Sequence, residues 1–182
     1  MRPLLPNPTR WLACALALVL CGAGLAAQDR LRIVPIVQDG EVVVSFELAD
    51  AYTNDVREAI ASGLRTTFTY DVQLRSVGTL WVDRTIATVI VAISDQYDNL
   101  TRRHSLTRTV DGRVDEVLVT ADESVVRKWL TTFTRLPLYP TSTLDSGRDY
   151  YVRIRALSRP NSGSILGWTN ALTGRAKFTF IP

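Results

Sequence analysis

Cysteine and histidine are scarce in this chain of 182 residues, which has two cysteines and a single histidine, His104. Both cysteines, Cys14 and Cys21, lie within the first 27 residues. The remaining residues therefore have no thiol for a disulfide, a structural zinc site or a cysteine nucleophile. One histidine without cysteine leaves only carboxylate metal sites, and no calcium-loop spacing occurs. We expect no metal and no cofactor.

Lysine is also rare, with only Lys128 and Lys177, and the other cations are arginines. The leader contains Arg2 and Arg10, which leaves 19 basic residues against 18 acidic residues in the rest of the chain. A nucleic-acid-binding domain would show a marked excess of clustered positive charge. The nearly balanced charge excludes nucleic acid as the expected partner.

The first 27 residues have the three parts of a secretory signal peptide. An arginine-containing start without acidic residues, Met1–Arg10, precedes the apolar run Trp11–Val19, and small residues follow as far as Ala26 and Ala27. We expect cleavage near Ala26 or Ala27 and a periplasmic or secreted protein.

Two other interpretations of the leader remain open. A lipoprotein signal would need a small residue before the modified cysteine, but Leu20 precedes Cys21. An uncleaved anchor is the second, because residues 11–27 reach the lower limit of about 17–25 residues for a membrane span. No later segment is long and apolar enough to cross a membrane, so residues 28–182 are expected to form one soluble domain.

The pattern of this domain predicts an α+β fold, dominated by strands in a mostly antiparallel sheet or sandwich with two packed helices. Asp39-Gly40 and Asp111-Gly112 each separate two β-branched runs, which is a strong hairpin signal. Trp81–Ser94 has apolar residues on both faces, which indicates a central strand. Seven or eight strands are expected, over residues 31–37, 41–48, 64–75, 81–94, 100–110, 113–120, 150–157 and 176–181.

Two helices are predicted between these strands. The first covers residues 54–62, with Thr53 or Asn54 as its cap and Gly63 at its end. The second begins at a capping box formed by Thr120 and Glu123. Its apolar residues recur at helical spacing as far as Phe133, and the prolines at 137 and 140 end it.

Four segments occur in the order Ala59–Leu64 leading into Phe68, Trp81–Asp83, Tyr97–Arg102 and Tyr150–Ala156. Together they resemble a bacterial family, domain of unknown function 4390. The resemblance spans roughly residues 31–182 and implies an exported protein without an assigned activity, so no catalytic residue is carried over. It also implies an association with a membrane sensor histidine kinase of the nitrogen-regulation type, whose genes often neighbour those of the family.

His104 and Ser105 do not form a nucleophilic pair in this interpretation. Adjacent strand residues point to opposite faces, so the imidazole cannot reach the hydroxyl. We expect His104 to be a polar residue on the outer face of its strand. Asp95 and Asp98 are expected to serve the turn near Tyr97.

The most informative polar residues are arginines with a tyrosine. Tyr151, Arg153 and Arg155 share one face of a strand, and Arg102 is expected to share a face of another strand with His104, Leu106 and Arg108. If these faces coincide, Arg102, Tyr151, Arg153 and Arg155 form a contact surface for an anionic ligand, a lipid headgroup or an acidic segment. The alternative is a solvated face whose arginines pair with neighbouring carboxylates. Trp168, in a glycine-flanked loop, is a candidate exposed anchor.

The residue inventory favours a non-enzymatic periplasmic binding or protein-interaction module. Its expected partner is the extracytoplasmic side of a membrane protein such as a sensor kinase. The alternative is a carrier that holds an apolar or lipidic ligand between sheet and helix. That alternative requires a cavity lined by Phe68, Val126, Trp129 and Phe133.

Overall fold

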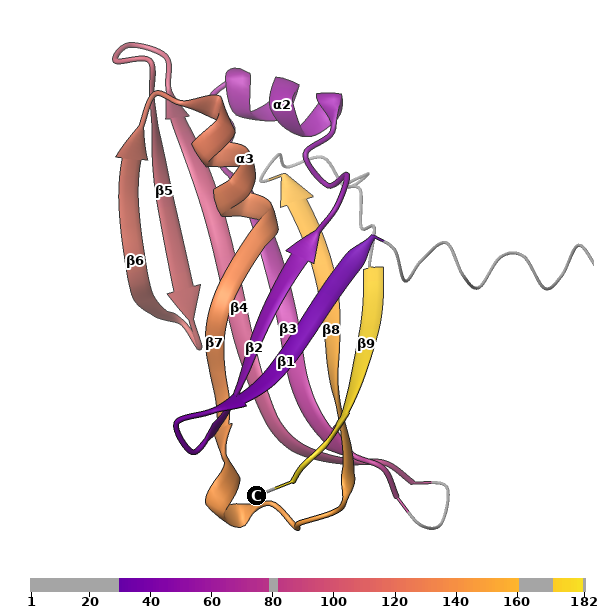
Figure 1. Ribbon diagram of the computed structural model, residues 1–182. Helices are drawn as coiled ribbons and strands as arrows, with labels where there is room; N and C mark the ends of the chain where they lie inside the picture. The colour runs from indigo at the N-terminus through magenta and orange to yellow at the C-terminus, as the bar shows by residue number, and fades with distance from the viewer. Residues whose placement is uncertain (1–29, 79–81, 161–171, 182) are drawn as a thin grey trace, which may run out of the picture.

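The computed structural model describes residues 30–78, 82–160 and 172–181, which form two antiparallel sheets packed face to face. The larger sheet has six strands in the order β6-β5-β4-β3-β8-β9, and the smaller sheet has three in the order β1-β2-β7. Figure 1 shows the two sheets crossing, with both helices at one end of the sandwich. The predicted strand-dominated α+β fold is confirmed.

Nine strands occur in the described residues. Both predicted hairpins form, because Asp39-Gly40 and Asp111-Gly112 each adopt positive φ at both positions, as tight hairpin turns require. β4 is central, and β4, β5 and β6 form an antiparallel meander. The strands are β1 (Leu31–Gln38), β2 (Glu41–Leu48), β3 (Thr66–Ser76), β4 (Arg84–Asp98), β5 (Arg103–Val110), β6 (Arg113–Thr120), β7 (Thr132–Pro140), β8 (Asp149–Pro160) and β9 (Leu172–Thr179).

The core lies between the two sheets and is built from alternate residues of each strand. Phe46 of β2 joins the sheets, with its ring centroid 4.8 Å from that of Tyr70 and 5.6 Å from that of Phe133. The Tyr70 hydroxyl donates a hydrogen bond to the Leu130 carbonyl at 2.8 Å. Burial raises the pKa of Tyr70, and the hydrogen bond satisfies a polar group that would otherwise be costly in the core.

The two helices are α2 (Asn54–Ala61) and α3 (Glu123–Thr131). Thr53 caps α2 by accepting from the Val56 N–H, and Gly63 follows the helix at φ +81°. The predicted capping box of the second helix is wrong. Asp122 is the cap residue, and its carboxylate accepts from the Ser124 N–H at 2.8 Å, while Thr120 accepts from the Asp122 N–H.

The predicted length of the second helix is also wrong, because α3 ends at Thr131 and the chain continues directly into β7. β7 is the strand that the sequence prediction lacks. Phe133 pairs with Phe46 of β2 as a strand residue, rather than lying on the helix. Pairing with β2 prevails over the helical spacing of the apolar residues, and the β-branched threonines around Phe133 favour the extended backbone.

A short single-turn helix η1 (Thr141–Thr143) follows β7.

The sandwich is open between β6 and β7, and Arg108 of β5 covers the core there. Its guanidinium lies 4.2 Å from the Trp129 ring centroid and 4.7 Å from that of Phe133, and it pairs with Glu116 at 2.8 Å. Burial lowers the pKa of Arg108, and the Glu116 carboxylate opposes that shift.

Residues 1–27 and Trp168 lie outside the described residues, so the predicted leader and the candidate anchor stay predictions. In the part of the chain that the structure describes, no helix has the length and hydropathy to cross a membrane.

Candidate functional site

The candidate contact residues of β8 lie on the outer face of the larger sheet. Tyr150, Val152 and Ile154 are buried in the core, so the alternate residues Tyr151, Arg153 and Arg155 point away from it. The predicted shared face of these three residues is therefore present.

Neighbouring strands extend this face with more cations. Tyr151 lies directly opposite Arg75 of β3 on one side and Lys177 of β9 on the other. Two residues further along β8, Arg153 lies opposite Gln73 of β3 and Arg175 of β9. Arg155 is exposed beside Asp71. We call this surface the basic face and define it as Arg75, Tyr151, Arg153, Arg155, Arg175 and Lys177.

Tyr151 is held rigidly in the basic face. Its hydroxyl donates a 2.7 Å hydrogen bond to the Asp83 carboxylate, and the guanidinium groups of Arg75 and Arg175 lie 5.9 and 5.8 Å from its ring centroid. These are cation–π distances. The Tyr151 hydroxyl and the Gly78 N–H lower the pKa of Asp83, while burial and then the Asp83 contact raise the pKa of Tyr151. An ionised Asp83 and a protonated Tyr151 therefore stabilise one another.

The carboxylates of this surface contact uncharged groups. Asp71 accepts from the Gln73 amide at 3.1 Å, and Gln73 in turn accepts from Arg153 at 2.9 Å. Among the residues that the structure describes, no ion pair involves Arg153, Arg155 or a cation of β9. Asp83 interacts with the charges of Arg75 and Arg175, but the five cations of the basic face outnumber Asp71 and Asp83, so the described part of this face is positive.

Arg102 is not part of the basic face. It lies in the turn between β4 and β5 at φ +56°, one residue before β5 begins. That turn is at the helix end of the sandwich, whereas β8, whose third residue is Tyr151, begins at the opposite end (Figure 1). The face of β5 that carries His104, Leu106 and Arg108 points into the sandwich, so the two predicted faces do not coincide.

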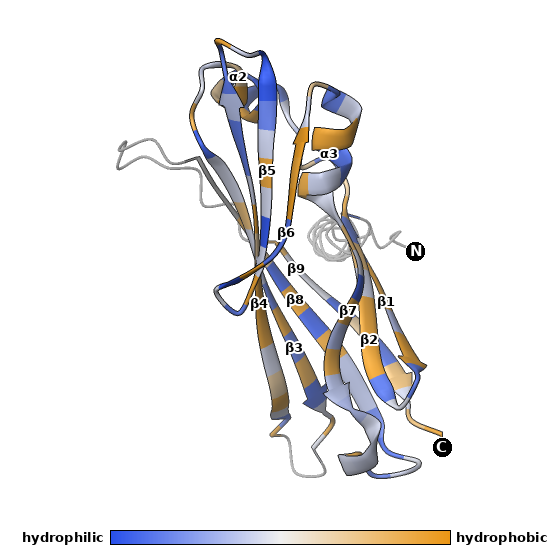
Figure 2. Cartoon of the chain, turned by 90° about the vertical axis from the view of Figure 1, so that its left-hand side faces the viewer, coloured by the Kyte–Doolittle hydropathy of each residue, from blue (hydrophilic) through white to orange (hydrophobic). Residues whose placement is uncertain are grey.

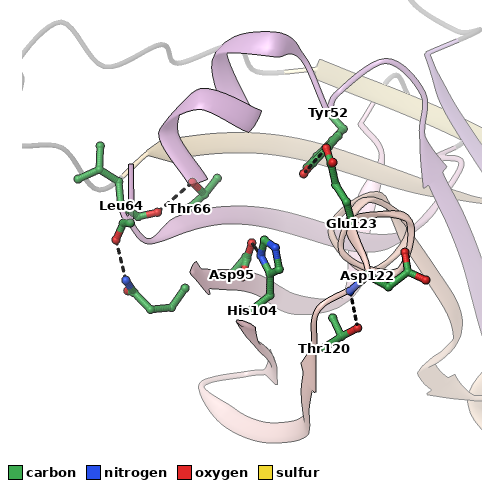
Figure 3. A network of polar contacts seen from close by, with 10 residues as sticks. Tyr52, Leu64, Thr66, Asp95, His104, Thr120, Asp122 and Glu123 are labelled. Atoms are coloured by element: carbon green, nitrogen blue, oxygen red, sulfur yellow. Dashed lines mark hydrogen bonds and ion pairs between the residues drawn. The ribbon is translucent and has the colours of Figure 1, made fainter. Parts of the chain in front are cut away.

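His104 is buried, which makes its expected position on the outer face wrong. Its Nδ1 lies 2.8 Å from an Asp95 carboxylate oxygen, and the Asp95 side chain is fully buried (Figure 3). The centroid of the imidazole ring also lies 4.6 Å from the centroid of the Tyr97 ring. The alternation along β5 places His104 on the same face as the buried Leu106, and this face is the inner one.

Asp95 is therefore not a turn residue. Asp98 is, because its carboxylate accepts from the N–H groups of Leu100 and Thr101. Burial raises the pKa of the Asp95 carboxyl, and its hydrogen bond and charge interaction with His104 oppose that shift. The second Asp95 oxygen, Oδ1, is buried and has no hydrogen-bond partner among the described residues.

An Asp–His pair can orient an imidazole as a general base, but a nucleophile must lie within reach. No hydrogen bond among the described residues joins His104 to a serine or threonine hydroxyl. Ser105 is exposed, and it pairs with Gln96 on the opposite face. Over the same residues, no group of three His, Cys, Asp or Glu side chains is placed to hold a metal ion. The pair satisfies two buried polar groups.

Sequence reasoning missed Arg75, Asp83, Arg175 and Lys177. The spacing of two between Arg175 and Lys177 indicates a shared strand face, and the apolar-polar alternation of residues 64–75 puts Arg75 on the polar face of its strand. Nothing local predicts the Asp83–Tyr151 contact, which joins residues 68 positions apart.

Comparison with known proteins gives one match. The family model described as Domain of unknown function (DUF4390) matches residues 29–161. No curated protein and no solved structure matches the chain.

Proposed function

The chain belongs to the DUF4390 family, whose description assigns no activity, and we propose that it is a non-enzymatic interaction module that binds an acidic protein segment through the basic face. The observation that carries the proposal is the group of exposed cations Arg155, Arg175 and Lys177, beside the nearly buried Tyr151 that packs against Arg75 and Arg175. Arginine and tyrosine are enriched where protein interfaces concentrate their binding energy.

The geometry of the basic face suits a carboxylate-rich partner. Arg155, Arg175 and Lys177 are exposed, and planar guanidinium groups can bind carboxylates through two parallel hydrogen bonds. Tyr151 is almost fully buried and held at its hydroxyl and its ring, so binding costs little further side-chain entropy there.

The proposed setting is the periplasm, and the proposed partner is the extracytoplasmic side of a membrane sensor kinase. The signal-peptide pattern of residues 1–27 supports an exported protein. The only histidine contacts a buried carboxylate, and the chain beyond residue 27 has no cysteine, which supports binding over catalysis.

The alternative function, a carrier of an apolar ligand, has weaker support. The four side chains that would line its cavity belong to the packed core, with exposures of 0–8%. Phe133 stacks on Phe46, and Arg108 covers both Trp129 and Phe133. These contacts fill the space that a ligand would need.

Replacing Arg153 and Arg155 together with alanine is expected to reduce partner binding at least tenfold, because each truncation at the centre of an interface commonly costs about 1 kcal/mol or more. The measurement is in vivo photo-crosslinking in the native envelope from a probe at Leu157, which shares the outer face of β8, followed by mass spectrometry of the captured protein.

Raising the salt concentration to about 1 M in a binding assay with the purified proteins should also weaken binding, since the Debye length falls to about 3 Å.

Arg127→Ala with Lys128→Ala is the matched control, because it removes the same charge from exposed positions of α3. This variant should crosslink as the wild type does. Equal loss in both double variants would mean that net charge, rather than the basic face, governs capture. Unchanged capture by the Arg153/Arg155 variant would overturn the proposal.

A further inference from the structure

Three of the four sheet edges have structural protection against pairing with another chain. β1 and β9 lie against one another, so closely that a Cβ on Gly174 would stand 3.0 Å from the side chains of Leu31 and Ile33. β7 contains Pro137 and Pro140, which lack an N–H, and a positive φ at Arg135 distorts it. Covered edges and prolines are common protections against edge-to-edge association.

The fourth edge, β6, has neither a covering strand nor a proline. It contains a bulge between Val114 and Glu116, but the half that follows, Val117–Thr120, pairs regularly with β5. None of its eight residues is buried, and Val114, Val117 and Val119 are 65%, 60% and 54% exposed. The strand contains no proline and no lysine, and its last four residues, Val117–Thr120, carry no charge. Figure 2 shows β6 on the outside of the sandwich with a hydrophobic stretch near α3. An exposed apolar edge of this kind is a template for strand pairing.

We infer that β6 pairs antiparallel with β6 of a second copy of this chain, so that two six-stranded sheets become one continuous sheet. The two copies are then related by a two-fold axis perpendicular to the sheet, which keeps each side chain on its own face. In an antiparallel pair of identical strands, this axis passes beside one residue, which lies directly opposite the same residue of the second copy. This symmetry allows one register for each residue that the axis can pass beside, and the charges of β6 make some of these registers unfavourable.

Axes at Asp115 or Glu116 are unfavourable, because each would place a carboxylate directly opposite its own copy. An axis at Leu118 places Val117 opposite Val119 of the second copy, and Val119 opposite Val117. Glu116 then lies opposite Thr120, so no two carboxylates face each other. β-branched residues paired across neighbouring strands are a favourable combination. The apolar half of β6 is therefore self-complementary about Leu118.

Leu118→Cys tests this register directly, in the full chain with Cys14→Ser and Cys21→Ser. Directly opposed residues have Cα atoms about 4.5–5.5 Å apart, within the range of about 4.4–6.8 Å for disulfides. Oxidation should therefore convert most of the protein to a covalent dimer on a non-reducing gel. In Val114→Cys, the two introduced thiols would lie about eight residues apart along the pair, roughly 26 Å, and should not crosslink.

Val119→Lys tests the pairing without cysteine chemistry. The wild-type chain should sediment as a dimer. The lysine should raise the dissociation constant of the dimer at least tenfold, because each dimer would bury two charged side chains, each opposite Val117 of the other copy. Val34→Lys, at a valine of β1 that is 42% exposed, should leave the dimer unchanged, and circular dichroism should show that both variants fold. A wild-type chain that sediments as a monomer, or equal crosslinking at positions 114 and 118, would overturn the inference.

Discussion

Replacing His104 with leucine is expected to lower the free energy of unfolding by about 3–5 kcal/mol at neutral pH, because removing the partner of a buried charge leaves that charge uncompensated. His104 is the side-chain hydrogen-bond partner of the fully buried Asp95, and the Gln96 N–H also lowers the pKa of that carboxyl. Leucine would fill much of the space but would leave the buried carboxylate without its side-chain donor. Urea denaturation at pH 7 measures the loss.

The same variant should show a specific pH dependence. Burial already raises the pKa of Asp95 in the folded protein, and His104 opposes that shift, so the pKa should rise further in His104→Leu. A carboxyl whose folded pKa exceeds its unfolded value costs stability above the folded pKa, and this cost disappears as the pH falls towards about 3.9. The difference between variant and wild type should therefore be largest near pH 7 and smaller near pH 4.

Ser105→Ala is the matched control, because Ser105 is the adjacent residue of β5 and is exposed on the opposite face. It should change stability by less than about 0.5 kcal/mol. Adding Asp95→Asn to His104→Leu should recover part of the loss, since no charge then remains buried at the site. Equal destabilisation at pH 7 and pH 4 would contradict the role assigned to the pair.

Replacing Phe46 with alanine is expected to cost about 3–5 kcal/mol of stability, because it removes the ring that joins the two sheets and leaves a cavity. Phe46 is 2% exposed and contacts Tyr70 of the larger sheet and Phe133 of β7. Denaturant unfolding followed by tyrosine and tryptophan fluorescence measures the loss.

Val34→Ala serves as the control for Phe46→Ala, because Val34 is 42% exposed on β1 of the same sheet. It should change the free energy of unfolding by no more than about 0.5 kcal/mol. A loss below about 1 kcal/mol in Phe46→Ala would show that the contact between the sheets does not depend on this ring.

Features fixed by a few neighbouring residues were predictable. The two Asp-Gly hairpins, the start of α2 at Thr53 and the alternation of β3 follow from turn geometry, capping and the period of two along a strand. The common face of Tyr151, Arg153 and Arg155 follows for the same reason.

Features that depend on distant partners were not predictable. β7 extends because it pairs with β2, about 90 residues earlier in the chain, although its apolar spacing resembles a helix. Alternation shows that His104 and Ser105 face opposite ways, but the position of β5 in the sandwich decides which of them is buried. The separation of Arg102 from the basic face depends equally on the order of the strands.

The sequence by itself determined the fold class, the hairpins, the short helix α2 and the scarcity of catalytic side chains, because composition and local backbone preferences act within a few residues. Only the tertiary structure decided that cations from three strands form the basic face, that Asp95 contacts His104, and that the second half of β6 is a regular edge without a covering strand. Each of these depends on strand order and on which face of a sheet meets the core, and long-range packing sets both.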